Sequence, residues 1–324
     1  MTAPESNSNA ESSDIKRPNE FSNSNSSPNK RLKAEEEMKT QSTATEASRA
    51  NSSSHKGFIA IEADAAEDRG SRHTMEDAWV VLDDATLEFP GNLRCAHFAI
   101  YDGHGGRSAA EYAQKHLHVN VLSAGLPREL MDVKSAKKAI LNGFLKTDEA
   151  LLQESAAGGW QDGATAVCVW VLGQTVFVAN IGDAKAVVAR SSATDVSQSG
   201  PERSNPVKAI VLTREHKAIY PQERARIQKA GGSVSSNGRL QGRLEVSRAF
   251  GDRQFKKVVP LAFALSSSCN IFVFGPSDAV EFVHKLLKEG LPVTTVSRRL
   301  VREAVRERRC KDNCTAIVIV FRQQ

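Results

Sequence analysis

Short apolar runs alternate with turns through the central part of the chain. The clearest cover residues 95–101, 164–172 and 175–181. Short runs separated by glycine-containing turns are typical of antiparallel hairpins rather than of parallel strands with helical crossovers. The Gly173-Gln174 pair therefore predicts a tight hairpin between the last two runs. Further runs that predict strands are 58–63, 79–82, 184–189, 208–212 and 315–321.

Helical periodicity interrupts these strands in blocks. Residues 107–122 and 133–155 form the two longest stretches, and 277–289 and 294–309 follow towards the C-terminal end. Ala136, Ile140 and Phe144 in the second stretch recur at the spacing of one helix face. Because whole helices are inserted among antiparallel strands, the pattern predicts packed sheets with helices on the outside.

The composition changes sharply at Gly57. Residues 1–56 are rich in Ser, Asn, Glu and Lys and have few apolar side chains, so they cannot bury enough surface to offset the entropy of ordering. We predict a disordered tail over 1–56 and a folded domain over 57–324. Two basic clusters in the tail, at 16–17 and 30–33, are open to two interpretations, a two-part nuclear import sequence or scattered charge on a solvated tail.

Composition excludes several classes of protein. Among the 324 residues no apolar run approaches the roughly 20 needed to cross a bilayer, so we expect no membrane partner. The start of the chain lacks the layout of a secretory sequence, and five cysteines do not form a disulfide framework. We therefore expect a cytoplasmic or nuclear protein. A net charge of +5 would attract acidic substrates.

A basic helical stretch lies near the C-terminal end, with six arginines between 298 and 309. A phosphate or nucleic-acid patch is one interpretation, and a solvated helix face is the other. The stretch has no interleaved aromatic residues and no nucleic-acid-binding motif. We favour the solvated face and expect no nucleic-acid partner.

Three segments far apart in the sequence carry side chains suited to metal and phosphate chemistry. Residues 102–106 read Asp-Gly-His-Gly-Gly, between a predicted strand and a predicted helix. Upstream, Arg72 precedes the pair Glu76 and Asp77, and Asp312-Asn313 precedes the last predicted strand. Each segment alone is ordinary, a glycine turn or a charged surface. Carboxylates gathered from distant segments nevertheless indicate an oxygen-ligand metal site.

Together these segments resemble the metal-dependent type-2C protein phosphatases, serine/threonine phosphatases that need magnesium or manganese. The resemblance runs from about Gly57 to the C-terminal end. Further matching blocks occur, in the same order, at 163–166, 179–186, 212–217 with its following helix, and 244–252. The resemblance implies an α+β fold with four layers, α-β-β-α, in which helices flank a central antiparallel β-sandwich and the metal site lies at one end.

The resemblance also implies a set of metal ligands for two Mg²⁺ or Mn²⁺ ions. Asp102 would bridge the two ions and Gly103 would contribute its carbonyl. Asp312 would complete the carboxylate set of the first ion, and Glu76 and Asp77 would hold coordinated waters or a metal edge. A further, loosely bound ion is implied at Asp183.

Two side chains are implied to act on the substrate. Arg72 would clamp the phosphate, because a guanidinium presents paired donors to phosphate oxygens. His104 would be the general acid that protonates the departing serine or threonine oxygen, while water attacks directly. We interpret His216 and Asp252 as hydrogen-bonded structural residues, and the cysteines as packing residues.

One segment departs from the family pattern. Residues 258–274 contain no aspartate, whereas the family carries an Asp-Gly there that contributes a carboxylate to the same ion as Asp312. The replacement would weaken that ion and leave the sandwich incomplete around 258–274. Two functions follow: a monomeric enzyme that dephosphorylates phosphoserine and phosphothreonine in protein substrates, or a catalytically weak or inactive phosphatase-like module that binds phosphoproteins.

Overall fold

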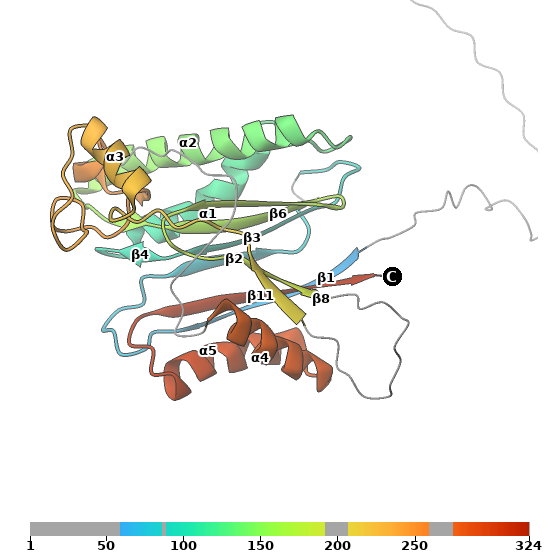
Figure 1. Cartoon of the computed structure of the whole chain (residues 1–324). Coiled ribbons are helices and arrows are strands. Elements are labelled where there is room, and N and C mark those ends of the chain that lie inside the picture. Colours follow the sequence, from blue (N-terminus) through green and yellow to red (C-terminus); the bar gives the residue numbers. More distant parts are fainter. Residues whose placement is uncertain (1–58, 86–88, 192–206, 259–274, 324) are drawn as a thin grey trace, which may run out of the picture. The chain divides into compact units, whose positions relative to one another are not determined.

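The computed structural model describes residues 59–85, 89–191, 207–258 and 275–323 (Figure 1). The predicted tail over 1–56 and nearly all of the atypical segment 258–274 lie outside these residues, so both predictions remain open. No helix in the described part of the chain is long and apolar enough to cross a membrane.

A four-stranded antiparallel sheet forms the centre of the domain. Its strands are β2 (Ala78–Leu82), β3 (Cys95–Tyr101), β6 (Ala166–Leu172) and β7 (Thr175–Ile181), paired in that order. Leu172 faces Thr175 across the turn, which confirms the predicted hairpin. Side chains on both faces of β3 and β6 are largely buried, which explains why these runs are almost continuously apolar.

Two further pairs of strands complete the sheets. β1 (Ile59–Asp68) pairs with β11 (Cys314–Gln323), so the first and last strands of the domain lie side by side. β8 (Val187–Ser191) pairs with β9 (Val207–Val211). The predicted strand 184–189 therefore begins later than expected, because the amide of Ala186 bonds to the Thr213 hydroxyl and not to a strand ladder.

Helices cover both outer faces (Figure 1). α1 (Ser108–Ser123) and α2 (Val133–Gly158) pack their apolar sides on one face of the central sheet. The opposite face packs on β1 and β11, whose outer face carries α4 (Pro276–Lys288) and α5 (Val293–Arg302). These layers confirm the predicted α-β-β-α arrangement.

The helix predicted over 294–309 was wrong at its end. α5 stops at Arg302 and continues as a π-helical turn, Glu303–Glu307. The amide of Arg308 reaches back to the carbonyl of Glu303, a wider spacing than the α-helical ladder. The basic stretch is therefore not one continuous helix face.

A small sheet at one end of the sandwich positions the site. It consists of β10 (Phe250–Gly251), β5 (Gly163–Ala164) and β4 (Gly103–His104), paired in that order. The predicted strand 164–172 is thus divided between β5 and β6. One more helix, α3 (Pro221–Lys229), follows the 212–217 block as the resemblance implied. The pairing brings residues near 103, 163 and 251 together.

Candidate active site

The corner at Asp102 and Gly103 is held by close backbone contact. A β-carbon on Gly103 would lie 2.3 Å from the carbonyl oxygen of Glu76, a separation that no real side chain tolerates. The carbonyl of Asp102 also accepts a hydrogen bond from the amide of Thr165, 2.9 Å away. Glycine at 103 therefore lets the loop carrying Glu76 and Asp77 lie directly against the corner.

Asp102 lies in a strongly negative environment. Its side chain keeps a surface open to solvent, yet protein atoms surround it closely. This desolvation, together with the charges of Asp77, Asp183 and Asp312, raises the pKa of Asp102 to about 7, although His104 opposes the shift. Three separate carboxylates thus contribute to the rise. Removing this repulsion requires either protons or a bound cation.

Asp77 experiences the same field in a more buried position. Its carboxylate accepts a hydrogen bond of 2.6 Å from the Thr315 hydroxyl on β11. Burial raises the pKa of Asp77 to about 6, and the charge of Asp312 adds to that rise while the Thr315 bond opposes it. Asp77 and Asp102, predicted together from distant segments, are therefore close enough to interact.

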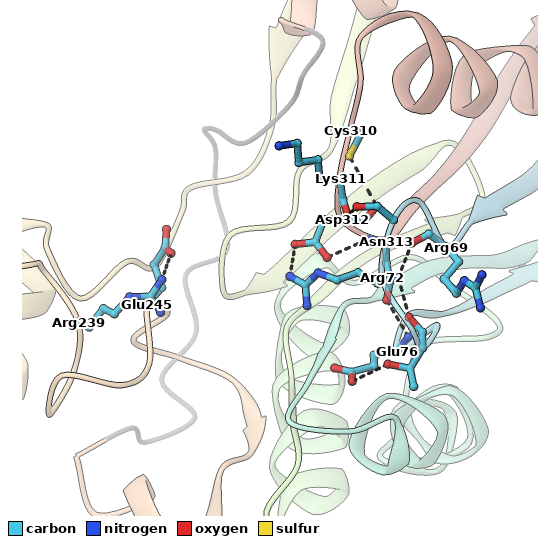
Figure 2. A network of polar contacts seen from close by, with 11 residues as sticks. Arg69, Arg72, Glu76, Arg239, Glu245, Cys310, Lys311, Asp312 and Asn313 are labelled. Carbon is cyan, nitrogen blue, oxygen red and sulfur yellow. Dashed lines mark hydrogen bonds and ion pairs between the residues drawn. The ribbon is translucent and has the colours of Figure 1, made fainter.

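Asn313 ties the loop around Arg72 to the segment before β11 (Figure 2). Its side-chain amide donates to the carbonyls of Arg69 and Thr74, at 3.0 and 2.9 Å. Its side-chain oxygen accepts from the amide of Glu76 at 2.8 Å. The Glu76 side chain accepts from the Thr74 hydroxyl at 3.1 Å. One asparagine thus fixes the path of the whole loop.

Arg72 and Asp312 form an ion pair at the open edge of the site (Figure 2). A guanidinium nitrogen of Arg72 lies 2.7 Å from Asp312 Oδ2, and the two side chains are 56% and 61% exposed. Exposed pairs of this kind contribute little to stability. The predicted phosphate clamp and the predicted metal ligand are therefore together, but each is engaged with the other.

His104, two residues after Asp102, is held by a buried carboxylate. Its Nε2 lies 2.9 and 3.0 Å from the two carboxylate oxygens of Asp252, and the side chain of Asp252 is only 4% exposed. Burial tends to lower the pKa of His104, but the hydrogen bond and charge of Asp252, and the charges of Asp102 and Asp183, outweigh it and raise the pKa. A raised pKa favours the protonated imidazole that a general acid needs.

Asp183 belongs to a separate series of linked ion pairs. Lys217 places its ammonium 3.5 Å from Asp183 and 3.0 Å from Glu245, and Glu245 also accepts from Arg239 at 3.2 Å. Figure 2 shows the Arg239 and Glu245 end of this series. Burial raises the pKa of Asp183, with Lys217 opposing. The negative charge of Asp183 contributes to the raised pKa of Asp102, although Lys217 partly balances that charge.

The chemistry of these donors fits hard divalent cations. Several carboxylates repel one another around Asp102, and oxygen donors of this kind are the ligands that Mg²⁺ and Mn²⁺ prefer. Within the described residues, however, no three acidic, histidine or cysteine side chains already stand as a closed ligand set. The pairing of Asp312 with Arg72 is one visible reason. A cation would have to draw Asp312 away from Arg72.

Two residues of the site were missed as functional candidates. Asp252 was interpreted as structural, yet it contacts His104; its place at the end of the 244–252 block was the only sequence indication. Lys217 was not considered, yet it pairs with Asp183. His216, by contrast, is buried and burial lowers its pKa to about 4, which agrees with a structural role. Cys95 and Cys168 are buried in the core.

Comparison with known proteins adds independent findings. Residues 61–271 match the family model described as Protein phosphatase 2C. The chain is 72% identical over 286 residues to "Probable protein phosphatase 2C 8" of Arabidopsis thaliana, covering 84% of this chain and 82% of that protein. It is 35% identical over 298 residues to the "Integrin-linked kinase-associated serine/threonine phosphatase 2C" of Mus musculus, covering 82% and 72%.

The fold has a counterpart among solved structures. The serine-threonine phosphatase 2C from Toxoplasma gondii superposes with a TM-score of 0.64 at 20% identity, covering 83% of this chain and 96% of that one. At this identity the likeness concerns the fold alone. The sequence relatives indicate the family, and this structural neighbour agrees with the fold.

Proposed function

The chain belongs to the protein phosphatase 2C family, and we propose that the carboxylates around Asp102 hold the two divalent cations of its active site. Its function is metal-dependent hydrolysis of phosphoserine and phosphothreonine in proteins, as the family model and the named relatives indicate. The gathering of the Asp77, Asp183 and Asp312 carboxylates around Asp102 carries the assignment of the site, because mutual repulsion among carboxylates is what a bound cation relieves.

Each ligand has a place in this proposal. Asp102, the Gly103 carbonyl and Asp312 would hold the ions, with Asp102 shared between them, and Glu76 and Asp77 would hold coordinated waters or a metal edge. When bound, the ions would lower the pKa of a coordinated water and neutralise phosphoryl oxygens. Asp183 would hold a further ion only weakly, since Lys217 already partly balances its charge.

Arg72 and His104 would act on different groups of the substrate. Arg72 would orient the phosphoryl group through paired donors once Asp312 no longer engages it. His104 would give a proton to the serine or threonine oxygen as the bond to phosphorus breaks. The exposed position of Arg72 supports its access to a phosphorylated loop of another protein.

The alternative of an inactive binding module is not favoured. The relatives with high identity are named as phosphatases, and Arg72, Asp102, His104 and Asp312 are all present. We retain the proposals of a monomer and of a cytoplasmic or nuclear location. Imaging of the full chain with and without the basic residues 30–33 replaced by alanine would test the nuclear part.

Phosphate release from a phosphothreonine peptide by the purified chain tests the proposed site. We expect release to require Mn²⁺ or Mg²⁺ and to fall by at least about a thousandfold in Asp102→Asn, as is usual when charge stabilisation in the transition state is lost. Asp278→Asn is a matched control, because Asp278 lies on α4, away from the site, and pairs with Arg308. Equal loss in both variants, or metal-independent release, would count against the proposal.

A further inference from the structure

The Asp252 side chain that contacts His104 is fixed inside the protein. Asp252 is buried, and both of its carboxylate oxygens lie within hydrogen-bond distance of His104 Nε2. His104 itself retains access to solvent, with 28% of its side chain exposed. The acceptor is therefore fixed inside the protein, and the imidazole extends from it towards the surface.

The backbone of Asp252 is held in a restricted conformation. Its φ is +50° and its ψ +44°, a left-handed conformation that costs energy for a residue other than glycine. The amide of Asp252 donates to the carbonyl of Asp162, and the neighbouring amide of Gly251 donates to the buried carboxylate of Asp148 at 3.0 Å. Surrounding contacts thus overdetermine the position of this carboxylate.

Room for the pair depends on a glycine on the middle strand of the small sheet. A β-carbon on Gly163 would lie 2.2 Å from His104 Nε2 and 2.6 Å from the Asp252 carboxylate. β4 and β10 both pair with β5, with His104 opposite Gly163 and Gly251 opposite the same residue. Three segments therefore converge to leave one space, which the imidazole and the carboxylate share.

We propose that Asp252 is the positioning residue of His104, holding Nε2 so that Nδ1 is the nitrogen that delivers a proton to the leaving oxygen. This rests on the proposed role of His104 as general acid. A carboxylate bound to one ring nitrogen fixes both the tautomer and the orientation of the ring. Asp252 acts on the reaction only through His104.

The proton balance follows from this arrangement. In the protonated imidazole both nitrogens carry hydrogen, and Nε2 donates its hydrogen to Asp252. As the bond from phosphorus to the serine or threonine oxygen breaks, that oxygen takes the Nδ1 proton and leaves as the alcohol. His104 remains neutral with its hydrogen on Nε2, still bound to Asp252, and regains the Nδ1 proton from solvent.

A structural role for Asp252 alone would have different consequences from a positioning role. General acid catalysis matters most for a poor leaving group such as an alkoxide, and little for p-nitrophenolate, which needs no proton to leave. Loss of positioning should therefore affect a phosphothreonine peptide far more than p-nitrophenyl phosphate. Loss of fold or of metal binding should lower both activities by the same factor.

The test compares both substrates in Asp252→Asn, His104→Gln and the double variant, each checked for folding and Mn²⁺ binding. We expect Asp252→Asn to lower kcat on the peptide by about 30- to 100-fold, within the range of general acid catalysis, and on p-nitrophenyl phosphate by less than about threefold. The double variant should be no slower than His104→Gln, because the two residues act as one unit. Asp64→Asn is the matched control: Asp64 on β1 accepts a hydrogen bond from the Ser297 hydroxyl on α5 and has no role in the positioning of Asp252.

The results of this test distinguish a failure of the positioning role of Asp252 from a failure of the general-acid role of His104. If Asp252→Asn lowers both activities equally, or adds fully to His104→Gln, the positioning role is wrong. If His104→Gln itself shows no dependence on the leaving group, the general-acid role fails instead. Nitrogen NMR of His104 in the unmodified chain decides the matter even if a variant does not fold: the neutral ring should carry its hydrogen on Nε2, and a hydrogen on Nδ1 would overturn the inference.

Discussion

The site around Asp102 has two parts that are built in opposite ways, the pair of Arg72 with Asp312 and the pair of His104 with Asp252. In the first, Arg72 and Asp312 meet on loops as a pair in which each side chain is more than half exposed. In the second, His104 binds an acceptor that is 4% exposed and fixed by the small sheet. The part assigned to proton transfer is preformed. The part assigned to phosphate and metal must exchange partners before it can act.

This difference has a physical reason. A proton donor needs one fixed geometry, and burial of its partner supplies that geometry. A phosphate clamp has to open for a bulky protein substrate, so a weak, exposed pair is easier to break than a buried one. Under the proposed assignment, the ion pair between Arg72 and Asp312 would keep both charges paired until a cation and a phosphate replace it.

The largest effect should come from the ion pairs that join α3 to the segment before β10. Glu223 on α3 is buried and binds Arg248, Arg226 and the Ser247 hydroxyl. Burial opposes its ionisation, but these partners lower the pKa of Glu223 to about 2. Glu223→Gln should reduce the free energy of unfolding by about 3 kcal/mol at pH 7, as expected when a buried ion pair is broken. Urea denaturation measures this change.

The pH dependence of this loss has a definite sign. Because the pKa of Glu223 is depressed in the folded state, its contribution is complete above the ordinary value of 4.5 and disappears as the pH falls through about 2. The unmodified chain should therefore lose its advantage over Glu223→Gln on acidification. Arg72→Ala should cost less than about 1 kcal/mol at any pH. Equal costs for the two variants would break the comparison.

The next effect concerns the choice of arginine at the open edge. Arg72→Lys keeps the positive charge but loses the paired, planar donors. We expect kcat/KM on a phosphothreonine peptide to fall by about tenfold or more, corresponding to about 1.4 kcal/mol or more in transition-state stabilisation. Arg69→Lys, on the same loop but without a contact to Asp312 in the described structure, is the matched control. Full activity of Arg72→Lys would show that charge alone is sufficient.

A smaller effect should appear in thermal stability without metal. Burial and neighbouring carboxylates raise the pKa of Asp102 from 3.8 to about 7. The stabilising protonated form is therefore retained below pH 3.8 and lost as the pH rises through about 7. In EDTA, Asp102→Asn should melt a few degrees above the unmodified chain at pH 8. The difference should vanish towards pH 4, and its persistence there would contradict an electrostatic origin.

The fold could be predicted from sequence where one residue pattern decides the element. β3 and β7 were predicted with their observed boundaries because a largely apolar run was bounded by polar or glycine residues. The predicted strand 164–172 was split because Thr165 bonds to the Asp102 carbonyl, a contact between segments far apart in the chain. The predicted end of the last helix was wrong because the π-helical turn after α5 has no distinctive residue pattern.

The sequence predicted which residues form the site better than it predicted how those residues contact one another. Side-chain types and order along the chain indicated Asp102, Asp77 and Asp312 as one cluster, and the electrostatic interactions among them agree with this. The bond between His104 and Asp252 was not predictable, because it depends on two-residue strands too short to leave a periodic pattern. The sequence alone likewise did not indicate that Arg72 and Asp312 form an ion pair.

Calorimetric titration of Mn²⁺ into the unmodified chain, Arg72→Ala and Asp102→Asn tests the central claim most directly. If the carboxylates around Asp102 hold the cation and Arg72 occupies Asp312 beforehand, Arg72→Ala should bind Mn²⁺ about two- to fivefold more tightly, the equivalent of one exposed ion pair. Asp102→Asn should bind it far more weakly. Unchanged or weaker binding by Arg72→Ala, or unchanged binding by Asp102→Asn, would contradict the account.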